Sequence, residues 1–191
     1  DKGANNSASS WTILPGISVR PFRILKLGIT ANYEKNHDEL QYVTTATDPI
    51  PGVTRYILGT IDQTTLGLTF RADVNLTPEF SIQYYGSPFI SRSKYTDLKR
   101  VTSPEAKNYS DRFAVYQNPV YANGVYFLSD NDNGVPVNVT AANPDFNFHQ
   151  FRSNLVAKWE YRLGSFIYLV WSSDRTGSNM FPGASMRDSY R

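Results

Sequence analysis

The chain lacks most of the residues on which metal, redox and nucleophilic chemistry depend. It contains no cysteine, so neither a disulfide framework nor a thiolate metal site is possible. Its two histidines, His37 and His149, stand in no catalytic motif, and no Gly-x-Ser-x-Gly nucleophile elbow accompanies them. The run from Asp130 to Gly134 resembles a calcium loop but fails its pattern at the fifth and twelfth positions. We therefore predict no metal, no cofactor and no catalytic residue, and a chain that is not an enzyme on its own.

Strong net charge and long apolar runs are missing as well. The net charge of +2 is too small to predict nucleic-acid binding. No stretch of about 18 apolar residues occurs, so no transmembrane helix is predicted. The first ten residues, DKGANNSASS, lack the apolar core of a signal peptide. We expect a mature fragment, or a chain that starts inside a longer protein, with its 191 residues in one domain.

What the chain does have is aromatic residues, at 14%, and regular alternation of polarity. Between Thr64 and Tyr85, apolar and polar side chains alternate on both sides of the reversal at Thr77–Glu79. Successive side chains of a strand point to opposite faces, so this segment predicts a hairpin with one apolar and one polar face. The apolar positions are Leu66, Leu68, Phe70, Ala72, Val74, Leu76, Phe80, Ile82 and Tyr84.

Further strands are predicted along the rest of the chain. Alternation is clear at residues 11–20, 25–34 and 154–162, weaker at 39–47 and 55–62, and residues 166–171 are apolar on both faces. Turn signals stand at 20–22, 36–38, 48–52 and 163–165. Residues 91–144 show no sustained alternation and are predicted to form a long loop with only short local structure. Residues 172–191 are expected to contain no strand. The fold class is therefore all-β, with about eight antiparallel strands.

A membrane barrel and a soluble β domain both show such alternation. Three features favour an outer-membrane β-barrel. The better strands reach the ten or so residues that a tilted transmembrane strand needs. Aromatic residues stand near strand ends, and short turns alternate with one very long connection, as in bacterial barrels. The aromatic residues concerned are Trp11, Tyr33, Tyr84, Trp159, Tyr161 and Trp171.

In a barrel, the polar side chains of the strands face the lumen. The charged ones have mixed signs: Lys26, Glu34, Arg71, Asp73, Lys158, Glu160 and Arg162. One interpretation is that they pair with one another and stabilise the wall. The other is that they act in selectivity or in conduction of a substrate.

Several motifs, DQTT, LTPEFSIQ, NPDFNF, RSNLV and KWEYR-x-GS, carry a family resemblance. Together the segments that contain them cover about half of the chain and resemble a family of large Bacteroidota cell-envelope proteins of unassigned function. Members join an N-terminal domain like a family-9 carbohydrate-binding module to a C-terminal outer-membrane β-barrel. The resemblance implies that residues 1–191 belong to the barrel, with an extracellular loop at about 91–144. Bacterial barrels close with an even number of strands. With about eight strands, no final strand after the loop that begins at Ser172 and hence an open end, this chain is expected to be part of a larger barrel.

The long loop contains the candidate binding residues. Tyr109, Tyr116, Tyr121 and Tyr126 fall in a polar segment with Phe113 and Phe127, where flat rings can stack on sugars. The alternative is that these rings pack the loop onto itself. We expect a non-enzymatic barrel of a Gram-negative outer membrane that anchors or passes glycan-related material. Its partners would be lipid, glycan, the rest of the barrel and the sugar-binding-like domain. The alternatives are the barrel anchor of an envelope carbohydrate-active enzyme and a soluble β-sandwich for adhesion or binding.

Overall fold

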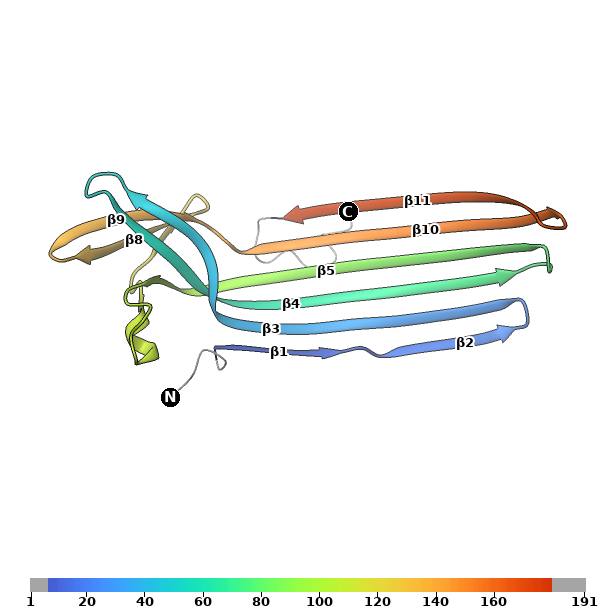
Figure 1. The fold of residues 1–191 in the computed structure, drawn as a ribbon, viewed down its shortest axis with the longest axis horizontal. Helices are drawn as coiled ribbons and strands as arrows, with labels where there is room; N and C mark the ends of the chain where they lie inside the picture. Colours follow the sequence, from blue (N-terminus) through green and yellow to red (C-terminus); the bar gives the residue numbers. More distant parts are fainter. Residues whose placement is uncertain (1–6, 180–191) are drawn as a thin grey trace. The chain divides into compact units, whose positions relative to one another are not determined.

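A computed structural model describes residues 7–179, and almost all of this range is β-strand (Figure 1). The strands are β1 (Ala8–Ile13), β2 (Gly16–Phe22), β3 (Leu25–Asp48), β4 (Val53–Asn75), β5 (Phe80–Val101), β6 (Phe113–Val115), β7 (Val120–Ala122), β8 (Val125–Asp132), β9 (Val135–Ala142), β10 (Phe146–Arg162) and β11 (Ser165–Asn179). The 3-10 helix η2 (Tyr109–Arg112) is the one helical element of this range. The prediction of an all-β, antiparallel fold is therefore confirmed. None of residues 7–179 belongs to a helix with the length and apolar character needed to span a membrane.

The strands form two sheets. The larger has the order β1-β3-β4-β5-β10-β11, with β2 also paired to β3 and β6 paired to β5. β1 and β2 follow one another along the same edge, beside β3 (Figure 1). The smaller sheet has the order β7-β8-β9. Within the described range β11 is not paired with β1 or β2, so the larger sheet has two open edges.

The chain divides into two compact units, described separately below. The hairpin unit comprises residues 7–10, Asn36–Gln63 and Ser93–Asp145. The sheet unit comprises Trp11–Lys35, Thr64–Arg92 and the described residues from Phe146 onward. β3, β4 and β5 each contribute residues to both units.

The hairpin unit has an ordinary apolar core. In β9, Val137, Val139 and Ala141 are buried while Asn138 and Thr140 between them are exposed. This alternation places one face of the strand against the interior. The buried cluster consists of Ile57, Leu98, Tyr116, Leu128, Val137, Val139 and Ala141. These side chains are removed from solvent by one another, so this unit has a core of its own.

Two Asn-Gly turns shape this unit. Asn123 and Gly124 join β7 to β8 with φ of 52° and 81°, and Asn133 and Gly134 join β8 to β9 with φ of 51° and 90°. Two-residue turns with both φ positive match the twist of antiparallel strands, and Asn followed by Gly is the pair that adopts them most readily. The run from Asp130 to Gly134 is therefore the end of a strand and a hairpin turn.

The predicted loop at 91–144 is wrong as a description of this segment. β5 continues to Val101, and β8 and β9 form a regular hairpin with unbroken register from Val125 paired with Ala142 to Asp132 paired with Val135. The many Asn, Asp and Pro residues of this segment are typical of a loop. The alternation of β9 and the two Asn-Gly turns are nevertheless strong local signals for hairpins.

Three boundaries also differ from the predictions. No turn occurs at Asn36–Asp38, because β3 runs through it and the His37 ring bonds to Asp62 of β4 with Nδ1 and Oδ1 2.8 Å apart. The first reversal lies at residues 23–24, after the predicted position, since β2 continues to Phe22. β11 continues to Asn179, although no strand was expected after residue 171. The rest of that polar stretch lies outside the described residues.

The remaining reversals agree with the sequence. β3 ends at Asp48 and β4 begins at Val53, as the Pro- and Gly-rich run predicted. At the turn after β4, the backbone N–H groups of Glu79 and Phe80 donate to Thr77 Oγ1 at 3.2 and 3.0 Å. At the turn after β10, Gly164 has a φ of 76° and its N–H donates to Glu160 Oε1 at 2.7 Å. The turns that join β2 to β3, β4 to β5 and β10 to β11 lie at the same end of the sheet unit (Figure 1).

Candidate functional site

One face of the sheet unit is apolar and uncovered. Of its described apolar side chains, Ile90 alone is buried, whereas Phe70 is 38% and Leu169 67% exposed. The register aligns the apolar positions across strands: Leu155 opposes Trp171, and Ile17 opposes Ile29. The large exposed side chains at these positions include Trp11, Ile17, Val19, Ile29, Leu68, Phe70, Trp159, Ile167, Leu169 and Trp171. A continuous apolar surface of this extent marks an interaction with something other than water.

Aromatic rings stand at both ends of this apolar face. Trp11 and Tyr33 have ring centroids 5.3 Å apart, near the end of the unit that is remote from its turns. Trp159 and Tyr161 lie 6.2 Å apart, close to the turn between β10 and β11. From Leu25 to Tyr33, β3 covers about 27 Å at roughly 3.4 Å per residue. The apolar band of an outer-membrane barrel is about 25 Å tall and is flanked by aromatic girdles, and a strand length of about 27 Å tilted by about 35–45° rises through roughly 19–22 Å of it.

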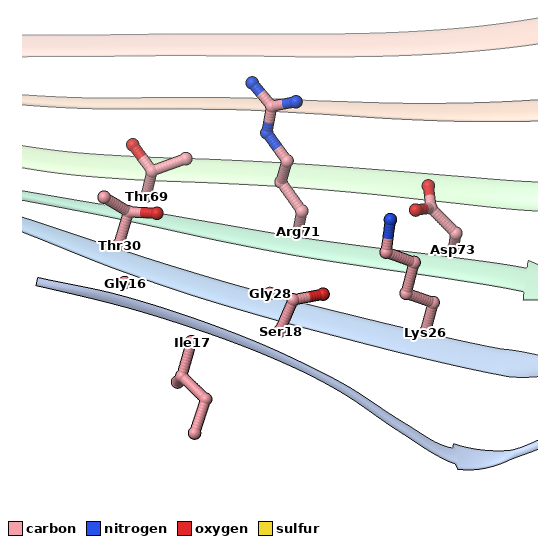
Figure 2. A pocket seen from close by; sticks show the side chains of 9 residues that line it. All are labelled: Gly16, Ile17, Ser18, Lys26, Gly28, Thr30, Thr69, Arg71 and Asp73. Carbon is pink, nitrogen blue, oxygen red and sulfur yellow. The ribbon is translucent and has the colours of Figure 1, made fainter.

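The opposite face is polar and hollowed. A hollow of about 560 Å³ lies over β2, β3 and β4, and Figure 2 shows its side chains. Lys26, Thr30, Thr69, Arg71 and Asp73 extend to one side of the sheet. The side chain of Ile17 points to the other side in the same view. The sheet unit thus separates an apolar surface from a polar one, as the alternation in the sequence predicted.

β11 departs from this separation between Phe166 and Trp171, where both of its faces are apolar. Phe166, Tyr168 and Val170 are all exposed and share a face with Lys158, which opposes Tyr168 in the register. The ammonium of Lys158 lies 4.3 Å from the centroid of the Phe166 ring. The polar face therefore ends in an apolar strip at this edge.

The charges on the polar face do not pair with one another. No ion pair of the described range joins any two of the seven charged residues predicted to face the lumen. Arg71 instead lies over the ring of Tyr85, 5.6 Å from its centroid, and Glu160 accepts the hydrogen bond from Gly164. The interpretation that these side chains stabilise the wall by mutual pairing is therefore wrong. The second interpretation, selectivity or conduction, stays a prediction.

The four predicted glycan-contacting tyrosines lie in different surroundings. Tyr116 is buried at 7% exposure and belongs to the core, so its ring is not available to a sugar. Tyr109 is half-buried and packs edge-on against Phe113, with centroids 5.5 Å apart. Tyr126 is half-buried and lies 4.9 Å from the exposed ring of Tyr121. The interpretation that the rings pack the loop onto itself accounts for Tyr116. Sugar contact by Tyr121 stays a prediction.

A nearly buried charge cluster that the sequence did not predict lies in the hairpin unit. The carboxylate of Asp130 accepts from Arg55 Nη2 and from Arg100 Nε, each at 2.9 Å. The Asp130 and Arg55 side chains are only 9% and 10% exposed. The hydrogen bond to Asp130 raises the pKa of Arg55. Because Arg55 and Asp130 are far apart in the sequence, no local pattern links them. A smaller hollow, of about 370 Å³, lies beside this cluster and is lined in part by Arg100, Tyr116 and Asp130.

The pKa of Tyr116 is raised well above the ordinary tyrosine value, first by burial and then by the charge of Asp130. The unfolded chain therefore loses this proton at lower pH than the folded protein does. The contribution of Tyr116 to stability is fully present below about pH 10 and falls as pH rises above it, by about 1.4 kcal/mol per pH unit. We expect Tyr116→Phe to reduce this alkaline loss, measured by denaturant unfolding at pH 9, 10 and 11. Parallel pH curves for the variant and the wild type would contradict this account.

Neither chemistry nor similarity to known proteins assigns a function to the chain. Among residues 7–179, no group of three or more His, Asp or Glu residues is arranged to hold a metal ion. Comparison with protein-family models, with curated proteins and with solved structures gives no match. The resemblance to Bacteroidota envelope proteins stays a prediction, and function has to be inferred from the two faces of the sheet unit.

Proposed function

We propose that this chain forms part of the wall of a β-barrel in a Gram-negative outer membrane. The observation that carries the proposal is the apolar face of the sheet unit, which is exposed along its whole length and has aromatic rings at both ends. Lipid is the partner that covers such a face without a second protein layer. A soluble sandwich would instead need a second sheet packed on this face.

The lengths of the strands support the same proposal. The parts of β3, β4 and β5 in the sheet unit run from Leu25 to Lys35, from Thr64 to Asn75 and from Phe80 to Arg92. Each is at least as long as the 9–11 residues of a tilted transmembrane strand. Their continuations in the hairpin unit bury an apolar core of their own and carry buried charges, both suited to water. We therefore place the sheet unit in the membrane and the hairpin unit in the aqueous phase outside the cell.

The barrel needs strands beyond those described. The larger sheet has six strand positions across its width and two open edges. The smallest bacterial barrels have eight strands. The partners in this proposal are thus membrane lipid and the remaining strands of the same barrel.

The role that we propose for this barrel is non-enzymatic. Its polar face carries an open hollow and unpaired charges, which suits contact with hydrophilic material that passes along or binds to the lumen. Glycan is the material that the resemblance implies, through the sugar-binding-like domain of that family. An envelope enzyme anchored by this barrel would need its catalytic residues in another part of the protein.

The topology can be tested with an inserted protease site. We expect a site inserted after Lys107, in an exposed connection of the hairpin unit, to be cut when protease is added to intact cells. The same site inserted after Pro78, in the turn between β4 and β5, should be cut only after the outer membrane is permeabilised. Immunoblotting of the fragments provides the measurement. Cutting at Pro78 in intact cells would invert the topology, and cutting at both positions would exclude membrane insertion.

A further inference from the structure

The hollow on the polar face holds two cations without carboxylate partners. Neither Arg71 nor Lys26 takes part in an ion pair of the described range, and the contact recorded for Arg71 is with the ring of Tyr85. A guanidinium carries five N–H donors in a rigid plane that matches a carboxylate in a two-point contact. The donors of Arg71 are therefore available to a ligand.

Small residues leave room beside Arg71. Gly28 lies next to it, since a Cβ at Gly28 would be 3.9 Å from the Cβ of Arg71. Ser18 opposes Gly28 and Gly16 opposes Thr30 in the pairing of β2 with β3. Among the described residues, no large side chain thus lies on the polar face directly between Arg71 and the edge strand. The resulting hollow, at about 560 Å³, falls in the size range of small-molecule sites.

The charges in the hollow suit a ligand with one negative charge. Arg71 and Lys26 contribute two positive charges and Asp73 contributes one negative charge. The local sum is +1, so the hollow attracts an anion, and a single carboxylate brings the local charge to zero. Asp73 accepts hydrogen bonds, and the hydroxyl groups of Thr30 and Thr69 both donate and accept them. These groups complement the hydroxyl groups of a sugar.

We propose that this hollow binds a carboxylated sugar unit, with the carboxylate on Arg71 and the sugar hydroxyl groups on Thr30, Thr69 and Asp73. The contact would be made inside the barrel, and in this respect the inference rests on the proposed function. It narrows the glycan-related material of that proposal to acidic saccharides, such as a uronic acid residue.

Glucuronate is the probe for this site. The whole barrel that contains this chain is extracted from the outer membrane into detergent micelles, its folding is verified by heat-dependent gel mobility, and glucuronate, glucose and acetate are titrated by calorimetry. We expect saturable binding of glucuronate and binding at least tenfold weaker for glucose and for acetate. Added NaCl should weaken the binding of glucuronate, because the contact with Arg71 is between opposite charges.

Two variants test the site by independent means. Arg71→Gln removes the guanidinium, and Gly28→Val fills the space beside it without changing any charge; each should weaken binding at least tenfold. Arg162→Gln is the matched control, because it removes the same charge from the polar face but does not line the hollow. Valine suits a strand, so Gly28→Val is expected to fold.

Three results would overturn the inference: no saturable binding by the folded barrel, acetate or glucose binding as tightly as glucuronate, or binding that survives Arg71→Gln. The protease-site experiment on cells distinguishes this failure from failure of the proposed function. A chain that inserts in the membrane but does not bind glucuronate refutes only the acidic-sugar site. A chain that fails to insert refutes the barrel.

Discussion

Replacing Phe70 by arginine is expected to destabilise the membrane-inserted protein by about 2–4 kcal/mol, the cost of a lipid-facing Arg near the bilayer midplane. Phe70 lies within the apolar run of β4 and is 38% exposed, with its ring 6.1 Å from that of Tyr84. The neighbouring Thr69 points to the polar face, so Thr69→Lys should cost less than about 0.5 kcal/mol. The measurement is urea unfolding of the protein in lipid vesicles.

Phe70→Leu completes this comparison. It removes the aromatic pair with Tyr84, which contributes about 0.5–1.5 kcal/mol, but keeps the position apolar. The additional loss in Phe70→Arg then reports on the lipid. Equal losses in Phe70→Arg and Thr69→Lys would reject the proposed orientation. An arginine at position 70 with no cost would show that this face meets water.

Replacing Asp130 by alanine is expected to destabilise the hairpin unit by about 3–5 kcal/mol, because removing one partner of a nearly buried ion pair leaves a charge uncompensated. Asp130 pairs with both Arg55 and Arg100, whose side chains are 10% and 20% exposed. In the variant Arg55 keeps Asp132 at 3.4 Å, whereas Arg100 loses the one ion-pair partner that it has in the described range. Hydrogen exchange of the β8 and β9 amides gives a local measurement of this loss. Tryptophan fluorescence would not report on this unit, because all three tryptophans lie in the sheet unit.

The control for Asp130→Ala is Asp62→Ala, which also removes a carboxylate from a contact between two side chains. Asp62 pairs with His37, but the two side chains are 63% and 42% exposed. Ion pairs in solvent contribute about 0–1 kcal/mol, so this variant should change exchange little. Similar effects of both substitutions would show that the buried cluster stabilises the hairpin unit no more than the exposed pair does.

The sequence predicts the sheet unit better than the hairpin unit, and the reason is physical. In the sheet unit, each strand between Leu25 and Lys35 or between Thr64 and Asn75 has one environment per face, so polarity alternates without interruption. In the hairpin unit, β6 to β9 have eight residues or fewer, β7, β8 and β9 are joined by Asn-Gly turns, and polar residues such as Asp130 are buried by pairing. Alternation of polarity in these strands is short, and it is broken by charged side chains whose partners are remote in the sequence.

The candidate site, too, could be predicted only in part from the sequence. The polar positions of Lys26, Arg71 and Asp73 follow from alternation, and their common face was predicted correctly. Their lack of mutual ion pairs could not be predicted, because it depends on side-chain distances across strands. The burial of Tyr116 was also beyond the sequence, since a tyrosine in a polar segment has the same pattern whether its ring is covered or free.

The two open edges of the larger sheet bear on how such a protein is made. β1 and β2 at one edge and β11 at the other present backbone donors and acceptors that no strand of the described range satisfies. In hydrocarbon each such group costs several kcal/mol, and in water an exposed edge recruits strands of other molecules. In the barrel that we propose, synthesis and transport across the periplasm would therefore have to keep these edges apart from other chains until further strands pair with them. Closure and entry into the bilayer would then be a single coupled event, because neither environment tolerates the open sheet for long.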